Sequence, residues 1–306
     1  MIDDVPLAPN RPNFFIVGAP RCGTASMYLY LKQHPEIYVS VIKEPQFFGG
    51  DLSPVPHGIR SEDVYLELFE GANGRPRRGE ASVWYLTSLQ APYEIRAFSP
   101  DARIVILLRE PAAMAYSLHS LYLRTGNEDL ESFEEALDAE ADRRDGRRVP
   151  DGAYFPEGLQ YTGAARYAPN VERYRDVFGP ENVHCVLFDD FVRDTPEEYR
   201  KTLEFLEVDP GFRAEHDPKR ASERVRMMAV RQLREASPEV RRRLRLEEMK
   251  KHESPPRPKL PEAVAARFRE RLADDTRALG RMLGRDLDPW LRGEGLAPEP
   301  AAAVVG

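Results

Sequence analysis

Residues 14–34 read FFIVGAPRCGTASMYLYLKQH. A short apolar run leads into a turn rich in glycine and proline, and apolar residues at helical spacing follow the turn. We therefore expect a buried strand over residues 13–17 and a helix over residues 24–33 that ends before a proline. A turn of this kind before a helix exposes several backbone N–H groups, and the helix dipole adds positive charge. The segment therefore predicts an anion-binding loop.

This turn departs from the loop of enzymes that use ATP or GTP. Their loop has the pattern G-x-x-x-x-G-K-[ST], whereas the turn here reads GAPRCGT, from Gly18 to Thr24. The lysine is missing and Arg21 stands inside the turn. The fork-shaped guanidinium of an arginine suits phosphate oxygens. An ordinary strand–turn–helix corner with a surface arginine is the alternative interpretation of this segment alone.

The rest of the first two thirds of the chain alternates strands and helices. The segment ARIVILLR, residues 102–109, is continuous and rich in β-branched residues, as in a strand covered on both faces. Further strands are expected over residues 78–82 and 183–188, and helices over residues 61–69, 111–124, 132–142, 170–178 and 196–206. This alternation predicts the α/β class, with a mostly parallel central sheet flanked by helices.

The pattern changes after about residue 209. A charged helix or helix pair is expected over residues 227–251, then a proline-rich hinge and a final amphipathic helix over residues 262–283. We therefore expect an α/β core over residues 1–225 and a helical C-terminal extension, residues 226–306, packed on it. The composition of the end of the chain predicts a disordered tail from about residue 295.

Composition limits the possible classes of protein. The 306 residues are 42% hydrophobic and 31% charged, with a net charge of −7, which suits a soluble globular protein and argues against one that coats nucleic acid. Two cysteines make neither a disulfide framework nor a metal cluster. The acidic, proline-rich start is unlike a signal peptide, and no apolar run is long enough to span a membrane. We therefore expect a cytoplasmic protein, whose oligomeric state the sequence leaves open.

A second candidate phosphate site follows the 102–109 strand. Arg109 ends this strand, and Ser117 lies two turns into the next helix. Ligands of open α/β sheets bind beyond the carboxyl ends of the strands, so a guanidinium and a hydroxyl there could hold a separate phosphate. Pairing of Arg109 with Glu110 is the alternative. The strand does not end in the aspartate with which ATP and GTP enzymes hold Mg²⁺, so we expect phosphate binding by arginines without a metal.

The motifs taken together resemble a known family. The order GAPRCGT, LKQHPEI, KEPQFF, GEASVWYL, RIVILLREPAAMAYS and VLFDDFVRDT, over roughly residues 13–225, is similar to that of sulfotransferases that use 3′-phosphoadenosine 5′-phosphosulfate (PAPS), above all the heparan-sulfate-type and bacterial branch. The resemblance implies a P-loop-like fold and in-line transfer of a sulfuryl group to a hydroxyl or amine. The acceptor would be a small molecule, lipid or carbohydrate, the product adenosine 3′,5′-bisphosphate (PAP), and no metal would be required.

The resemblance also implies roles for individual residues. Glu44 would be the general base, and Arg21 would stabilise charge during transfer. The residues implied to bind PAPS lie in the loop and the first helical turn, around the 3′-phosphate and in a basic loop over the nucleotide: Gly18, Ala19, Pro20, Arg21, Cys22, Gly23, Thr24, Ala25 and Ser26; Arg109 and Ser117; Lys219, Arg220, Ser222 and Arg224.

The acceptor side is less defined. The residues predicted there are one lysine and four aromatics: Lys43, Phe47, Phe48, Trp84 and Tyr85. The aromatics could equally belong to the core. The long loops over residues 49–60 and 142–160 are also expected to contact the acceptor.

The segment GEASVWYL departs from the family pattern E-K-S-x-x-Y, because Ala81 stands in place of the lysine. Either Arg21 or Lys43 would then supply that charge, or the catalytic balance differs in this subgroup, and the departure argues against a heparan-like substrate. Glu80, Ser82 and Tyr85 either shape the site or only pack at a strand edge.

Two other functions stay open at this point. One is a P-loop kinase or NTPase, which the missing lysine and strand-end aspartate disfavour. The other is a non-catalytic nucleotide-binding protein, suggested by Ala81. Separately, the composition, rich in alanine, arginine, proline and glutamate, suggests a bacterial, cytoplasmic enzyme that modifies a small metabolite.

Overall fold

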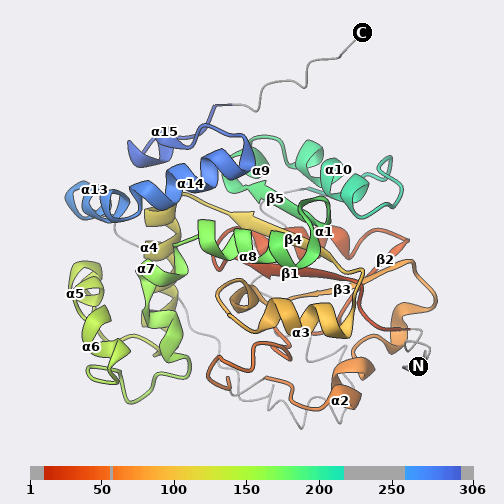
Figure 1. Ribbon diagram of the computed structural model, residues 1–306, viewed down its shortest axis with the longest axis horizontal. Coiled ribbons are helices and arrows are strands. Elements are labelled where there is room, and N and C mark those ends of the chain that lie inside the picture. Colours follow the sequence, from red (N-terminus) through yellow and green to blue (C-terminus); the bar gives the residue numbers. More distant parts are fainter. Residues whose placement is uncertain (1–9, 56–57, 217–258, 298–306) are drawn as a thin grey trace.

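The computed structural model describes residues 10–55, 58–216 and 259–297 (Figure 1). Its centre is a sheet of five strands in the order β2-β3-β1-β4-β5, and each neighbouring pair is parallel. The strands are β1 (Phe14–Gly18), β2 (Ile37–Val39), β3 (Arg77–Ala81), β4 (Arg103–Leu108) and β5 (Val183–Leu187). The predicted fold class is therefore confirmed.

Helices cover both faces of this sheet. The helices of this part of the chain are α1 (Thr24–Leu31), α2 (Glu62–Glu67), α3 (Ala91–Phe98), α4 (Pro111–Thr125), α5 (Phe133–Asp138), α6 (Glu140–Arg144), α7 (Tyr161–Ala164), α8 (Ala168–Phe178), α9 (Phe188–Arg193) and α10 (Thr195–Phe205), and Figure 1 shows α5, α6 and α7 to one side of the sheet. Figure 1 shows α3 and α8 side by side on one face, with α1 behind the sheet. Right-handed crossovers require this arrangement. The connection through α1 runs from β1 toward the β2 edge of the sheet, and the connection through α3 runs from β3 toward the β5 edge, so the two helices lie on opposite faces.

The central strands are buried on both faces, as their apolar sequences predict. All five residues of β1 are buried, and so are Ile104 to Leu108 of β4. Parallel strands end at the same edge of a sheet, so the segments after Gly18, Ala81 and Leu108 meet there. This edge carries the motifs that the sequence singled out.

The described part of the C-terminal extension packs on the core. It contains α13 (Glu262–Arg271), α14 (Ala273–Leu283) and α15 (Asp288–Leu291). The Asp275 carboxylate accepts hydrogen bonds from the backbone of Tyr167 (2.9 Å) and Ala168 (3.2 Å) at the start of α8. The indole of the buried Trp290 and the backbone N–H of Leu296 both donate to Asp189. The chain is therefore held to the core as far as residue 296.

Several expected elements differ in extent. Residues 132–142 form two helices, α5 and α6, and residues 262–283 also form two, interrupted at Leu272. Strand β2 and helices α3, α7, α9 and α15 were not predicted, because three to eight residues are too few to establish a period. The helix predicted over residues 227–251 lies outside the described residues. Among the helices described, none is both apolar and long enough to cross a bilayer.

Candidate functional site

The loop between β1 and α1 requires glycine at both ends. Gly23 precedes α1 with φ +91°, and a Cβ there would lie 3.3 Å from the rings of Phe188 and Phe191. At Gly18 a Cβ would approach Cβ of Leu86 to 2.6 Å. Side chains at these positions would displace the loop from the sheet edge. The backbone conformation and the close packing of the loop therefore explain both glycines of the motif.

The loop presents hydrogen-bond donors at the start of α1. Within the part of the chain that the structure describes, the backbone N–H groups of Gly23 and Thr24 donate to no protein acceptor. The Cys22 side chain lies on the inner side of the loop, with Sγ 3.3 Å from the Pro20 carbonyl oxygen. Burial raises the pKa of this thiol to about 12, so it stays neutral. The loop thus turns backbone dipoles, not a thiolate, toward the surface.

Three predicted phosphate ligands converge from three elements. Arg21 has a left-handed backbone conformation, φ +62°, and its Nε donates to the Ser117 hydroxyl on α4 at 3.0 Å. Arg109 follows β4, and its Nη1 donates to the Arg21 carbonyl oxygen at 3.4 Å. The Arg109 guanidinium also lies over the ring of Phe188, 4.6 Å from its centre. Sequence reasoning missed Phe188, although its position directly after β5 places it at the same sheet edge.

Glu110 does not pair with Arg109, the alternative considered from the sequence. Its carboxylate instead caps α4, accepting from the backbone of Ala112 (3.0 Å) and Ala113 (2.6 Å). It also accepts from Nε of Arg269 on α13 at 3.1 Å. The Arg109 guanidinium is therefore held by the loop and by Phe188.

Glu44 lies at this same edge, in a loop held against the end of β3. Its backbone N–H donates to the Ala81 carbonyl at 2.8 Å, and Oε2 of its side chain accepts from the Val83 N–H at 2.9 Å. Its other carboxylate oxygen pairs with the Lys43 ammonium. The Glu44 side chain is 30% exposed, whereas that of Lys43 is 8% exposed. A carboxylate is thus fixed in direction yet accessible.

The bond from Glu44 to Ala81 also places Lys43 near the position where the family has a lysine. Of the two residues considered as substitutes, Lys43 directly precedes the residue bonded to Ala81, whereas the Nε of Arg21 donates to Ser117.

Three of the four predicted acceptor aromatics are buried. Phe48, Trp84 and Tyr85 are 6%, 7% and 1% exposed, so they belong to the core. The Phe47 ring is partly buried and stacks on Tyr65, with 4.3 Å between ring centres. The Tyr85 side chain is nearly inaccessible and its hydroxyl accepts from the loop backbone, so its contact with the acceptor stays a prediction. Sequence reasoning missed Tyr65, which is four residues into an unremarkable helix segment.

The two loops expected to contact the acceptor meet each other. Ser53 donates from its backbone N–H (2.9 Å) and its hydroxyl (2.7 Å) to Oε1 of Glu157. Burial raises the pKa of Tyr122 and Tyr154, and the charge of Glu44 adds to both shifts. The two tyrosines therefore lie within electrostatic range of Glu44.

The predicted nucleotide-covering residues Lys219, Arg220, Ser222 and Arg224 lie outside the described residues. Within the described ranges, no three His, Cys, Asp or Glu side chains are grouped as a metal site would require.

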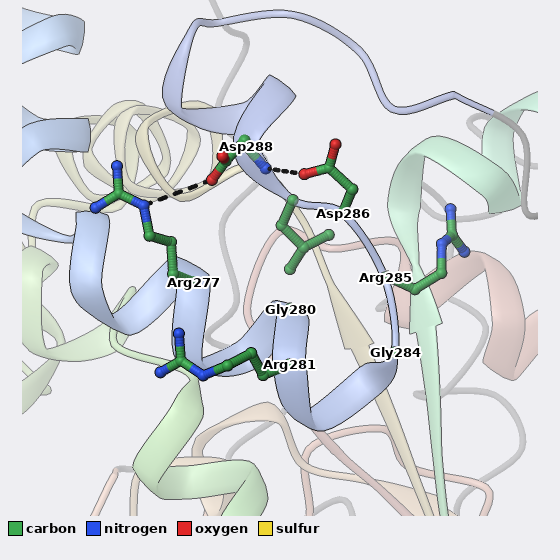
Figure 2. Close-up of a pocket in the computed structure, with 8 residues that line it drawn as sticks. Arg277, Gly280, Arg281, Gly284, Arg285, Asp286 and Asp288 are labelled. Carbon is green, nitrogen blue, oxygen red and sulfur yellow. Dashed lines mark hydrogen bonds and ion pairs between the residues drawn. The ribbon is translucent and has the colours of Figure 1, made fainter.

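A cavity of about 450 Å³ lies apart from this edge, between α14 and α15 (Figure 2). Two of the three arginines that line it pair with acids: Arg277 Nε lies 3.6 Å from Asp288, and Arg285 Nη1 lies 2.6 Å from Asp190. We assign this cavity no part in the site.

Comparisons with known proteins agree with this geometry. The family model described as "Sulfotransferase domain" matches residues 11–278. A solved sulfotransferase structure from Alicyclobacillus acidocaldarius is 33% identical, with a TM-score of 0.69, and the match covers 92% of this chain and 98% of that one.

Two relatives of known name match over shorter stretches. Carbohydrate sulfotransferase 15 of Homo sapiens is 30% identical over 169 residues, 41% of this chain and 30% of that protein. The bifunctional heparan sulfate N-deacetylase/N-sulfotransferase 1 of Mus musculus is 28% identical over 209 residues, 64% of this chain and 22% of that protein. The chain thus matches less than a third of the length of either relative.

Proposed function

Because the chain belongs to the sulfotransferase family, we propose that it transfers a sulfuryl group from PAPS to a hydroxyl or amine of an acceptor. One observation carries this proposal. Arg21, Arg109 and Ser117 converge at the sheet edge where the accessible Glu44 carboxylate is also held. Phosphate-binding groups and a base at one edge suit transfer from a phosphorylated donor.

The donor end fits a molecule with two separate anionic groups. The N–H groups of Gly23 and Thr24 at the start of α1 would hold the phosphosulfate. Arg109 and Ser117, joined to the loop by Arg21, would hold the 3′-phosphate. When bound, PAPS supplies an activated sulfuryl group attached to a phosphate leaving group. Charge that grows on this phosphate would be stabilised by the loop N–H groups and Arg21.

Glu44 would take the proton from the acceptor as it attacks sulfur in line. The Val83 N–H and the Lys43 ammonium fix the direction of its carboxylate, so no reorientation is needed. Proton removal by a positioned base accelerates such steps by about 10²–10⁴-fold. The ion pair with Glu44 also keeps the Lys43 ammonium beside the base, where it would serve the sulfuryl oxygens in place of the lysine replaced by Ala81.

We propose a carbohydrate-like acceptor with several hydroxyls. Two relatives are named for carbohydrate and heparan sulfate substrates. The phenol of Tyr154, which is 37% exposed and lies within electrostatic range of Glu44, can hydrogen-bond a sugar hydroxyl. A bacterial, cytoplasmic location stays a prediction from composition.

The first experiment is calorimetric titration with PAP, without magnesium, against 5′-AMP and ATP. We expect PAP to bind far more tightly than 5′-AMP, because only PAP carries the 3′-phosphate. Binding of ATP alone, and only with magnesium, would instead favour a P-loop kinase or NTPase.

The second experiment measures PAP release from PAPS with a panel of mono- and oligosaccharide acceptors. Glu44→Gln should abolish acceptor-dependent release and leave PAP affinity nearly unchanged. Glu67→Gln, on the exposed face of α2, is the matched control. PAP binding without release in any wild-type reaction would support a non-catalytic binding protein, and loss of PAP binding in Glu44→Gln would overturn the role of Glu44.

A further inference from the structure

The Glu80 carboxylate is completely buried at the end of β3, and three hydroxyls surround it. Tyr65 (3.1 Å) and Tyr85 (2.9 Å) donate to Oε1, and Ser82 (2.7 Å) donates to Oε2. A buried carboxyl group without such donors would be strongly destabilising. Glu80, Ser82 and Tyr85 are the residues of the E-x-S-x-x-Y spacing that the chain retains although it lacks the family lysine.

Two of the three hydroxyls also reach the loop that carries Glu44. The Ser82 oxygen accepts from the Gln46 N–H at 3.1 Å. The Tyr85 oxygen accepts from the N–H groups of Phe47 (2.8 Å) and Phe48 (3.2 Å). Each hydroxyl has a single proton, which is given to Glu80, so its lone pairs face the loop. Glu80 thereby orients acceptors for three consecutive backbone N–H groups.

The loop needs this support because its backbone is strained. Glu44 and Gln46 have φ values of +64° and +48°, a region that side chains with a Cβ rarely occupy. Such conformations persist where surrounding contacts fix them. On the Glu44 side the fixing contacts are the bonds to Ala81 and Val83, and on the other side they are the bonds to Ser82 and Tyr85.

We infer that Glu80 is a positioning residue that holds the Glu44 carboxylate in its working direction through Ser82 and Tyr85. This inference rests on the proposed function. The inference explains why Glu80, Ser82 and Tyr85 occur together although Ala81 stands in place of the family lysine. Glu80 contacts neither donor nor acceptor, and it acts on turnover through the loop.

The test compares two tyrosines that both donate to Oε1 of Glu80. Both are buried, but only the Tyr85 hydroxyl contacts the 43–48 loop. Tyr85→Phe should lower kcat for PAP release by about 10- to 100-fold, since small misplacements of a catalytic group have effects of this size. Tyr65→Phe should keep kcat within about threefold, because the loop bonds remain. The KM for PAPS and the Kd for PAP should be unchanged in both variants.

Substitutions of Glu80 itself separate positioning from packing. In Glu80→Gln the amide oxygen can accept from both tyrosines and the NH₂ group can donate to Ser82, so kcat should stay close to wild type. Glu80→Ala should show the low kcat of Tyr85→Phe. If Tyr85→Phe does not fold, Ser82→Ala replaces it, because it removes the acceptor of the Gln46 N–H.

Equal kcat values for Tyr85→Phe and Tyr65→Phe, per mole of folded protein, would overturn the inference. So would a Ser82→Ala variant as active as the wild type. These outcomes require a wild type that releases PAP, so they differ from failure of the proposed function, in which the wild type itself releases none.

Discussion

Nε of Arg21 donates a hydrogen bond of 3.0 Å to the hydroxyl of Ser117, which lies 96 residues further along the chain. The sequence predicted that Arg21 binds the phosphosulfate and that Ser117 binds the 3′-phosphate. The bond joins these two predicted sites, and the contact of Arg109 with the Arg21 carbonyl joins them again. Arg21 therefore links the two predicted phosphate sites of the donor.

Arg21→Ala should weaken binding of PAP more than binding of 5′-AMP, which lacks the 3′-phosphate. Loss of one charged hydrogen bond typically costs about 1.5–3 kcal/mol, which corresponds to a rise in the Kd for PAP of about 10- to 100-fold. Calorimetry on both nucleotides measures the difference. Arg103→Ala is the control, because Arg103 is at the opposite end of β4 and pairs with Glu207. Equal losses for PAP and 5′-AMP would restrict Arg21 to the 5′ end.

Glu80 should make the folded state less stable as the pH rises. Burial raises its pKa from 4.5 to about 7, although three hydroxyl donors oppose the shift. The folded state thus holds the proton more tightly than the unfolded state, so stability falls between about pH 4.5 and 7 and levels off above. The pKa shift corresponds to a loss of about 3 kcal/mol in the free energy of unfolding.

Urea unfolding of the wild type and Glu80→Gln at pH 5, 6, 7 and 8 measures this effect. The free energy of unfolding of the wild type should decline relative to that of the variant over this range, because the side-chain amide of the variant cannot ionise. A difference between the two proteins that is constant with pH would show that Glu80 does not titrate there.

Local sequence was enough to predict the strands that position the site. Strands β1 and β4 are continuous apolar runs, and the rule that ligands bind beyond strand ends placed Gly18, Arg109 and Ser117 at one edge. Strand β2 has three residues, and Gln90, the residue before α3, makes no side-chain capping bond, so neither has a strong local signal.

Through-space pairs could not be predicted in the same way. Ser82 and Gln46 are 36 residues apart, and nothing in either segment shows that the Ser82 oxygen accepts from that N–H group. Their meeting depends on the register of β2 against β3 and on the left-handed backbone of Glu44 and Gln46. The same holds for Phe188, which supports Arg109 only because β5 lies beside β4.

Gly23→Ala should impair PAP binding as well as stability. The substitution would place a side chain at φ +91° and crowd the rings of Phe188 and Phe191 at 3.3 Å. Gly74→Ala provides the matched control, since Gly74 has φ +73° but nothing within 4 Å of an added Cβ. Both variants should lose roughly 1 kcal/mol of stability from backbone strain. Only Gly23→Ala should also raise the Kd for PAP, and an equal Kd in the two variants would contradict the role of the loop.

The ion pair between Glu128 and Arg143 should be essential for the stability of the α4–α7 region. Both side chains are fully buried, and two guanidinium bonds of 2.7 and 2.6 Å join them. Burial by itself would raise the pKa of Glu128, but the bonds from Arg143 lower it below its ordinary value. The stabilisation from this pair is therefore present at neutral pH. It is lost as the pH falls below the ordinary pKa of a glutamate, 4.5, toward the lower pKa of Glu128 in the folded state.

Arg143→Met should lower the free energy of unfolding by about 3–5 kcal/mol, because it leaves a buried carboxylate without its partner. Arg147→Met is the control: its pair with Asp142 is exposed, 61% and 38% for the two side chains, and should contribute little to stability because water screens it. In the double variant with Glu128→Gln, the total loss should be smaller than the sum of the two single losses, since the second substitution removes the uncompensated charge. Denaturant unfolding of the four proteins of this cycle measures the coupling. An Arg143→Met variant as stable as Arg147→Met would show that the buried pair contributes no more than an exposed one.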